Sequence, residues 1–260
     1  MDFNNDSNYF DQHFLIDNDI INTFINSAVL NENDVVVEVG PGKGNISKLI
    51  AKKVKKLYCI ELDKRLKPFL DQLINENKNV EVIYGNVLDI SIPECNKLIT
   101  ALPYSIIEPF INKMINYNID IYMIMGKKYV DSVLNNEITK LSLLTNCYYN
   151  IEKVIDITPD KFDPKPRVMS SIIKLKYKNI NDINNKSLLI FRYMFYYKDK
   201  KTKNALIESL IDTSNKELTQ KESKNIIKNL NINEKILDKT FETLSNKELN
   251  ELYNNIEILK

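Results

Sequence analysis

Short apolar runs recur along the first half of this sequence, and helical patterns separate several of them. The runs occupy residues 35–39, 57–62, 80–84, 97–100 and 121–125, and the helical patterns cover 45–54, 65–77 and 107–118. Runs that are apolar almost throughout are typical of strands covered on both faces of a sheet. Strands that alternate with helices in this way predict an α/β fold with a doubly wound, mostly parallel, Rossmann-like sheet.

The second half of the sequence changes character twice. Residues 148–157 and 170–177 have strand patterns on either side of the proline-containing segment 160–168, and these two strands could complete the sheet in antiparallel orientation. After the polar segment 178–186 the pattern is helical to the end. We therefore expect an α/β domain over residues 1–180 and a small helical domain over 181–260.

Composition excludes several classes of function. No apolar run approaches the length needed to span a bilayer, and the polar, acidic N-terminus is unlike a signal peptide, so we expect a cytoplasmic protein without membrane contact. Cys59, Cys95 and Cys147 are scattered and odd in number, which argues against a disulfide framework or a clustered zinc site. Because His13 is the sole histidine, we expect neither a metal centre nor a histidine-based triad.

Charge leaves nucleic-acid binding open. The formal net charge is only +1, so any such binding must depend on local basic runs. These runs lie at residues 51–56, 63–67, 126–128 and 197–203. Each of them taken alone is at least as consistent with a solvated helix face.

A glycine loop follows the first strand. Gly40, Gly42 and Gly44 lead from that strand into a helix, and Glu61 ends the next strand, where its carboxylate can accept both ribose hydroxyls of a nucleoside. This combination favours a nucleoside-bearing cofactor over a structural turn. Gly44 comes one residue too early for the dinucleotide spacing G-x-G-x-x-G, and Glu38 within the strand is typical of S-adenosylmethionine enzymes. We expect S-adenosylmethionine, and hence a class I methyltransferase domain.

The segment ALPY, residues 101–104, follows the fourth strand. Ligands of open α/β sheets lie beyond the carboxyl ends of the strands, so this segment is expected at the ligand site. A proline here fixes the chain and leaves nearby carbonyls available, and Tyr104 offers a flat face to a base. Taken alone, the segment is equally consistent with a proline turn beside a core tyrosine.

Several motifs together extend the prediction to a family. In chain order they are DQHFLID (11–17), VEVGPGKG (37–44), IELD (60–63), GNVLD (85–89), ALPYSI (101–106) and FDPKPRVMSS (162–171). This set resembles the ribosomal RNA adenine N6,N6-dimethyltransferases, which are related to the erythromycin-resistance methyltransferases. The resemblance spans nearly the whole chain, including residues 195–210, which are similar to the basic helix of the family.

The resemblance implies an activity and a partner. The expected reaction is S-adenosylmethionine-dependent N6-dimethylation of adjacent adenosines near the 3′ end of small-subunit ribosomal RNA, during ribosome biogenesis. The expected partner is the RNA of the pre-ribosomal small subunit, bound by a monomeric enzyme with the help of the domain 181–260.

The resemblance also implies roles for individual residues. On the cofactor side, His13 and Leu15 would border S-adenosylmethionine, Gly40 and Gly42 would cradle it, Glu61 would hold its ribose, and Asn86 would contact its adenine. On the substrate side, Tyr104 and Phe162 would stack on the target adenine, and the main-chain carbonyl of Leu102 would accept a hydrogen from its N6 amine. For His13 the alternative is an exposed polar residue in a mobile arm.

The chain departs from the family pattern at two positions. Ala101, expected to border the cofactor, stands where the family usually has Asn or Asp, whose side chain accepts from the target amine. Asn86 replaces an aspartate. Loss of one positioned polar group typically lowers a rate by about 10²–10³. A catalytically impaired assembly factor that binds ribosomal RNA is therefore the alternative, although the glycine loop and Glu61 favour the enzyme. A dehydrogenase is disfavoured by the glycine spacing.

Overall fold

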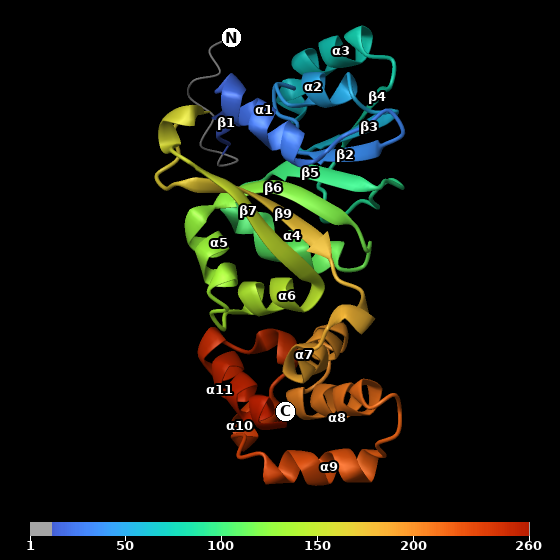
Figure 1. Cartoon of the computed structure of the whole chain (residues 1–260), viewed down its shortest axis with the longest axis vertical. Coiled ribbons are helices and arrows are strands. Elements are labelled where there is room, and N and C mark those ends of the chain that lie inside the picture. The colour runs from blue at the N-terminus through green and yellow to red at the C-terminus, as the bar shows by residue number, and fades with distance from the viewer. Residues whose placement is uncertain (1–11, 260) are drawn as a thin grey trace. The chain divides into compact units, whose positions relative to one another are not determined.

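The computed structural model describes residues 12–259, and at Tyr104 it describes the main chain alone. By its internal contacts the chain divides into two compact units (Figure 1). The first contains the chain up to Asp131 together with Ile151–Tyr177, and the second contains Ser132–Asn150 together with the chain from Lys178 onward. The chain passes from the first unit to the second for the last time between Tyr177 and Lys178, close to the boundary predicted at residue 180. Residues 132–150 belong to the helical unit rather than to the α/β domain.

A seven-stranded sheet forms the centre of the first unit, in the order β4-β3-β2-β5-β6-β9-β7. Strands β2 to β6 pair in parallel, and β9 pairs with β6 antiparallel, with Ile121 opposite Leu175. The predicted doubly wound, mostly parallel sheet is therefore confirmed. The strands are β2 (Val35–Val39), β3 (Lys56–Glu61), β4 (Val80–Tyr84), β5 (Lys97–Ala101), β6 (Asp120–Gly126), β7 (Tyr149–Ile157) and β9 (Ser170–Tyr177).

Helices cover the sheet on both faces (Figure 1). The strand order reverses direction between β2 and β5, and right-handed crossovers on the two sides of that point place their helices on opposite faces. Every second strand residue, such as Val36, Leu57 and Ile99, joins one core cluster with α1, α2 and α3. Strand residues of the opposite parity, such as Val37 and Leu98, are fully buried as well. The helices of this part are α1 (Asn18–Ser27), α2 (Ser47–Ala51), α3 (Lys67–Glu76), α4 (Ile107–Met114) and α5 (Lys127–Leu134), of which the residues from Ser132 on belong to the second unit.

The second unit is helical in its described residues. Phe191 is fully buried there and contacts the rings of Phe241 and Tyr253 at centroid distances of 6.3 and 5.4 Å. The guanidinium of Arg192 donates to the carbonyls of Cys147 and Lys178, at 3.1 and 2.9 Å. The helices are α6 (Lys140–Tyr148), α7 (Lys186–Tyr196), α8 (Thr202–Thr213), α9 (Gln220–Asn229), α10 (Glu234–Asp238) and α11 (Asn246–Ile256).

Helices α1, α5 and α6 and a two-stranded pair were missing from the sequence-based assignment. The pair consists of β1 (Phe14–Leu15) and β8 (Phe162–Asp163), which lie antiparallel. Two-residue strands give no periodic signal, and α6 is buried on most sides and so lacks the amphipathic pattern on which such an assignment depends.

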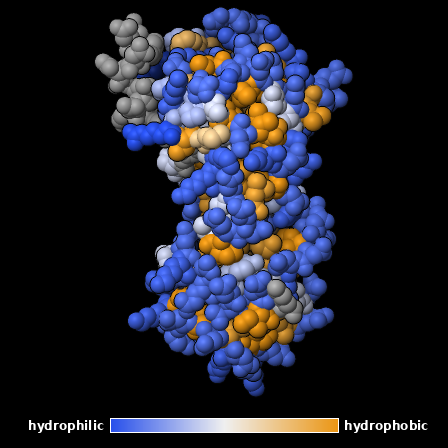
Figure 2. Space-filling model, turned by 60° about the vertical axis from the view of Figure 1, so that its left-hand side comes forward, coloured by the Kyte–Doolittle hydropathy of each residue, from blue (hydrophilic) through white to orange (hydrophobic). Residues whose placement is uncertain are grey.

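In residues 12–259 no helix combines the length and the apolar character that crossing a bilayer requires. Figure 2 shows a face on which hydrophilic residues predominate and hydrophobic ones form separate small areas. Within the same residues, no group of three or more His, Cys, Asp and Glu side chains is arranged to hold a metal ion.

Candidate active site

A pocket of about 390 Å³ opens at the carboxyl ends of the parallel strands. Its walls come from the residues that directly follow β2, β3, β4 and β5, and from the arm that precedes α1. This is the place where an open α/β sheet binds ligands, because the loops on either side of the reversal in strand order diverge there. The pocket lies wholly within the first unit.

The glycine loop forms one wall of the pocket. Gly40, Gly42 and Gly44 have φ values of +72°, +58° and +79°, which residues with a Cβ rarely adopt. A Cβ at Gly42 would lie 2.8 Å from a ring carbon of Phe14, so the glycine is also required for space. The loop therefore brings bare backbone to the pocket surface, as a cradle for a ligand requires.

Glu61 is oriented by two backbone amides. Its Oε2 accepts from the N–H of Gly42 at 3.1 Å, and its Oε1 accepts from the N–H of Asp63 at 2.8 Å. Burial raises the pKa of the Glu61 carboxyl, and these two hydrogen bonds oppose that rise. Because a carboxylate oxygen can accept more than one hydrogen bond, each oxygen keeps capacity for a further donor. This arrangement suits two adjacent hydroxyl groups.

Leu62 lies beside Glu61 on the pocket wall and is 51% exposed. An exposed leucine next to a buried carboxylate offers an apolar face to a flat ring and a polar partner to a sugar. Leu62 was not among the residues predicted from sequence, although its position directly after the strand-terminal acid was a usable signal.

Asn86 lies on the turn after β4, at the edge of the pocket. Its Oδ1 accepts from the N–H of Leu88 and its Nδ2 donates to Asp89, both at 3.0 Å. The ammonium of Lys113 on α4 fastens this turn, because it donates to the carbonyls of Val87, Leu88 and Ile90. Nothing in the local sequence signals that role for Lys113, since helix and turn are more than 20 residues apart in the chain.

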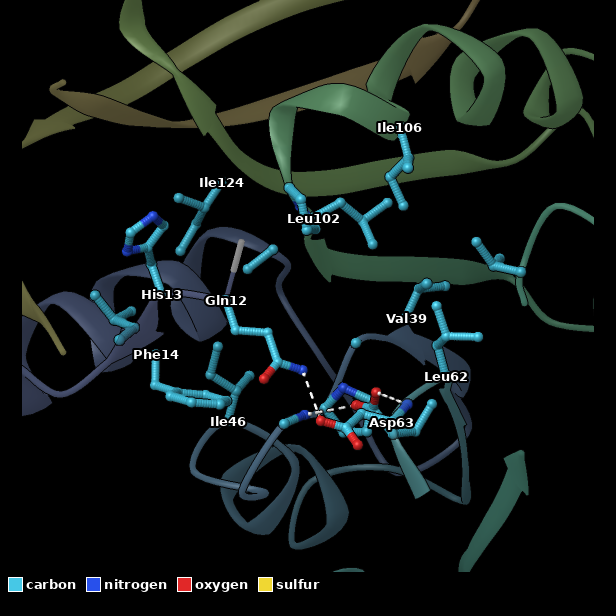
Figure 3. Close-up of a pocket in the computed structure, with 18 of the residues that line it drawn as sticks. Gln12, His13, Phe14, Val39, Ile46, Leu62, Asp63, Leu102, Ile106 and Ile124 are labelled. Carbon is cyan, nitrogen blue, oxygen red and sulfur yellow. Dashed lines mark hydrogen bonds between the residues drawn. The ribbon is translucent and has the colours of Figure 1, made fainter. Parts of the chain in front are cut away.

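The arm before α1 lies along the segment 161–164. The Nδ1–H of His13 donates to the carbonyl of Pro164 at 2.7 Å, and the N–H of Ile16 donates to the carbonyl of Lys161 at 3.0 Å. The Lys161 ammonium pairs with Asp17 at 2.6 Å. His13 is half-buried and lines the pocket, so it is not the exposed residue of the alternative interpretation (Figure 3).

The opposite wall contains the residues predicted to meet the substrate. Ala101 is half-buried at the end of β5, Leu102 is 9% exposed, and Phe162 is 4% exposed. All three line the pocket. Apolar Ile106 and Ile124 line it as well (Figure 3). The side chain of Tyr104 lies outside the described part of the structure, and its main chain begins the short 3-10 helix Tyr104–Ile106.

The fold thus gathers the predicted residues from distant parts of the chain. Of the residues assigned to the site from sequence, those that line this one pocket are His13, Leu15, Gly40, Gly42, Glu61, Asn86, Ala101, Leu102 and Phe162. Their individual roles stay predictions.

Glu38 lies behind the pocket wall, inside the core. Burial raises the pKa of its carboxyl to about 7, and the charge of Glu61 adds to the rise. The thiol of Cys59 lies 3.9 Å from the carboxylate. The uncharged acid is therefore the form that the folded, ligand-free protein favours below neutral pH.

This shift predicts a pH-dependent stability. Between the ordinary pKa of 4.5 and the folded value of about 7, the unfolded chain has released a proton that the folded chain retains. Stability therefore falls as pH rises through this window, by on the order of 3 kcal/mol in total. Glu38→Gln removes this contribution, so the variant should gain stability relative to the parent between about pH 5 and about pH 8. Urea unfolding of the ligand-free proteins measures this, and a stability difference independent of pH would contradict it.

Comparison with known proteins identifies the chain's relatives. The family model described as ribosomal RNA adenine dimethylase matches residues 3–249. A protein of Methanococcus aeolicus named "Probable ribosomal RNA small subunit methyltransferase A" is 34% identical over 256 residues, covering 94% of each chain.

Among solved structures, a dimethyladenosine transferase from Plasmodium falciparum has a TM-score of 0.64 at 22% identity, covering 94% of this chain and 98% of its own. The 23S rRNA methyltransferase ErmE has a TM-score of 0.61 at 18% identity, covering 94% and 99%. These two structures share the class I methyltransferase fold found here. The chain belongs to the ribosomal RNA adenine dimethylase family.

Proposed function

We propose that this protein transfers methyl groups from S-adenosylmethionine to the N6 amines of adjacent adenosines near the 3′ end of small-subunit ribosomal RNA. The observation that carries the proposal is the single pocket, in a chain of this family, that joins the glycine loop and Glu61 to the segments Ala101–Ile106 and Phe162–Pro166. In this proposal the first set of residues holds the nucleoside of the cofactor and the second set holds the target base, within the same pocket.

The residues of the first wall fit S-adenosylmethionine. The Glu61 carboxylate can accept two further hydrogen bonds, which matches the two hydroxyls of a ribose. Leu62 and the turn at Asn86 match an adenine. The glycine loop lets the cofactor approach the main chain closely. When bound, the cofactor supplies an electrophilic methyl group. No covalent nucleophile of the protein is needed for transfer to an amine.

The residues of the second wall prepare the adenine amine. The Leu102 carbonyl accepts a hydrogen bond from the N6 amine. This hydrogen bond turns the nitrogen lone pair out of conjugation with the ring and directs it toward the methyl group. Phe162 and Tyr104 hold the base by stacking. Ile106 and Ile124 keep this part of the pocket apolar, which strengthens the hydrogen bond to the carbonyl. The helical domain contributes to recognition of the particle.

Methyl transfer to small-subunit particles that lack the modification tests the proposal. Mass spectrometry of the digested RNA should show dimethyladenosine at adjacent positions near the 3′ end. Binding of the particle without any transfer would favour the assembly-factor alternative. Heat of binding with NAD but none with S-adenosylmethionine, measured by calorimetry, would contradict the cofactor assignment.

A further inference from the structure

One segment of the first unit is strongly basic. Between Glu38 and Glu61 the chain has six lysines and no acidic residue. Since the net charge of the whole chain is +1, the rest of the chain is net negative. This segment, which spans the glycine loop, α2 and the turn that leads to β3, therefore carries a large local excess of positive charge.

Five of these lysines have no ion pair within residues 12–259, and we call them the α2 lysine cluster: Lys43, Lys48, Lys52, Lys53 and Lys55. Lys52, Lys53 and Lys55 are exposed. The sixth, Lys56, pairs with Glu81 at 2.9 Å. Proximity to the carboxyl end of α2 explains a cation at Lys52, but not a cluster of five, because neighbouring like charges destabilise one another.

The lysines of the C-terminal basic run have a different environment. Lys198 pairs with Glu242 at 3.3 Å, Lys200 with Glu208 at 3.3 Å, and Lys201 with Asp238 at 3.5 Å. An adjacent carboxylate cancels most of the field that a lysine presents to a phosphate. The run 197–203, which the sequence suggests as an RNA-binding surface, is thus largely neutralised by its own neighbours.

The α2 lysine cluster also reaches the pocket. Lys43 lines the pocket wall, and its ammonium lies 5.0 Å from the centre of the Phe14 ring. Lys48 and Lys52 are four residues apart on and just beyond α2, so they project on the same side of the helix. An RNA strand whose base enters the pocket would therefore pass close to these lysines.

We infer that the α2 lysine cluster binds the phosphodiester backbone of the RNA whose adenine enters the pocket. This inference rests on the proposed function. It assigns the salt-dependent part of RNA affinity to the first unit and only a small part to the run 197–203. Each phosphate neutralised by a lysine releases condensed counterions, so affinity becomes steeply dependent on salt.

Two matched triple variants test this assignment. One replaces exposed members of the cluster, Lys52→Gln, Lys53→Gln and Lys55→Gln, and the control replaces the paired lysines, Lys198→Gln, Lys200→Gln and Lys201→Gln. Both remove three positive charges. The dissociation constant for an unmodified small-subunit particle is measured between about 50 and about 200 mM salt. The slope of log affinity against log salt should fall by about 2 in the cluster variant and by less than about 1 in the control, since each lost phosphate contact accounts for about 0.7–0.9.

Equal slopes in the parent and the cluster variant would overturn the inference, as would a larger change in the control. Methyl transfer by the parent protein is measured on the same particles. Transfer with an unchanged slope in the cluster variant would contradict this inference alone, whereas absence of both binding and transfer by the parent would contradict the proposed function. The affinity of each variant for S-adenosylmethionine should equal that of the parent, which shows that the pocket is intact.

Discussion

Replacing Ala101 with asparagine is expected to raise the rate of methyl transfer to a small-subunit particle by about one to three orders of magnitude. The resemblance to the family implies Asn or Asp at this position, where the side chain would accept a hydrogen bond from the target amine. Ala101 is half-buried at the end of β5 and lines the pocket, so a longer side chain can extend into the cavity. One positioned polar group accounts for about 10²–10³ in rate at comparable sites. Single-turnover kinetics at saturating cofactor measure the effect on the transfer step.

The control for this prediction is Ala101→Leu. Leucine is close to asparagine in size and shape but cannot accept a hydrogen bond, so it separates filling of the cavity from hydrogen bonding. We expect the leucine variant to be no faster than the parent. If both variants accelerate transfer, packing rather than the acceptor is responsible. If neither the parent nor Ala101→Asn transfers a methyl group while both bind the particle, the assembly-factor alternative is correct.

Much of the sheet could be predicted from sequence because its signals are local. A strand such as β2 is a short apolar run whatever its neighbours do, and the glycines that follow it mark a turn on their own. The parallel order then places the segment after each parallel strand at the same edge of the sheet, so Glu61 and Ala101 could be assigned to one site from sequence.

What the sequence did not reveal depends on contacts between distant segments. The pairing of β1 with β8 joins residues about 150 positions apart, and two-residue strands carry no pattern. The hydrogen bonds of Lys113 to the turn after β4 and the ion pairs of Lys200 and Lys201 likewise depend on tertiary packing. A lysine-rich stretch has the same composition whether acids neutralise it or leave its charge exposed, so only the structure distinguishes the two basic runs.

The glycine loop supports the other large prediction. Gly42→Ala should weaken the binding of S-adenosylmethionine by about 10- to 100-fold. The residue has a φ of +58°, and its new Cβ would lie 2.8 and 2.9 Å from two ring carbons of Phe14. The left-handed conformation costs a residue with a Cβ about 1–2 kcal/mol, and overpacking adds about 1–3 kcal/mol. The free protein can relieve part of this strain by local rearrangement, whereas the complex cannot. A difference of about 1.4 kcal/mol between the two states corresponds to a tenfold change in affinity, which gives the expected range.

Two further variants separate the causes of that loss. Gly44→Ala adds a Cβ at a similar φ of +79°, but its nearest neighbours lie at 3.7 and 4.0 Å, so it introduces strain without a clash. We expect it to lose much less affinity than Gly42→Ala in the same calorimetric titration. Adding Phe14→Ala to Gly42→Ala removes the ring atoms that the new Cβ meets and should restore part of the affinity. Equal losses for Gly42→Ala and Gly44→Ala, with no recovery in the double variant, would show that backbone strain alone matters and that the Phe14 ring does not define the space beside the glycine loop.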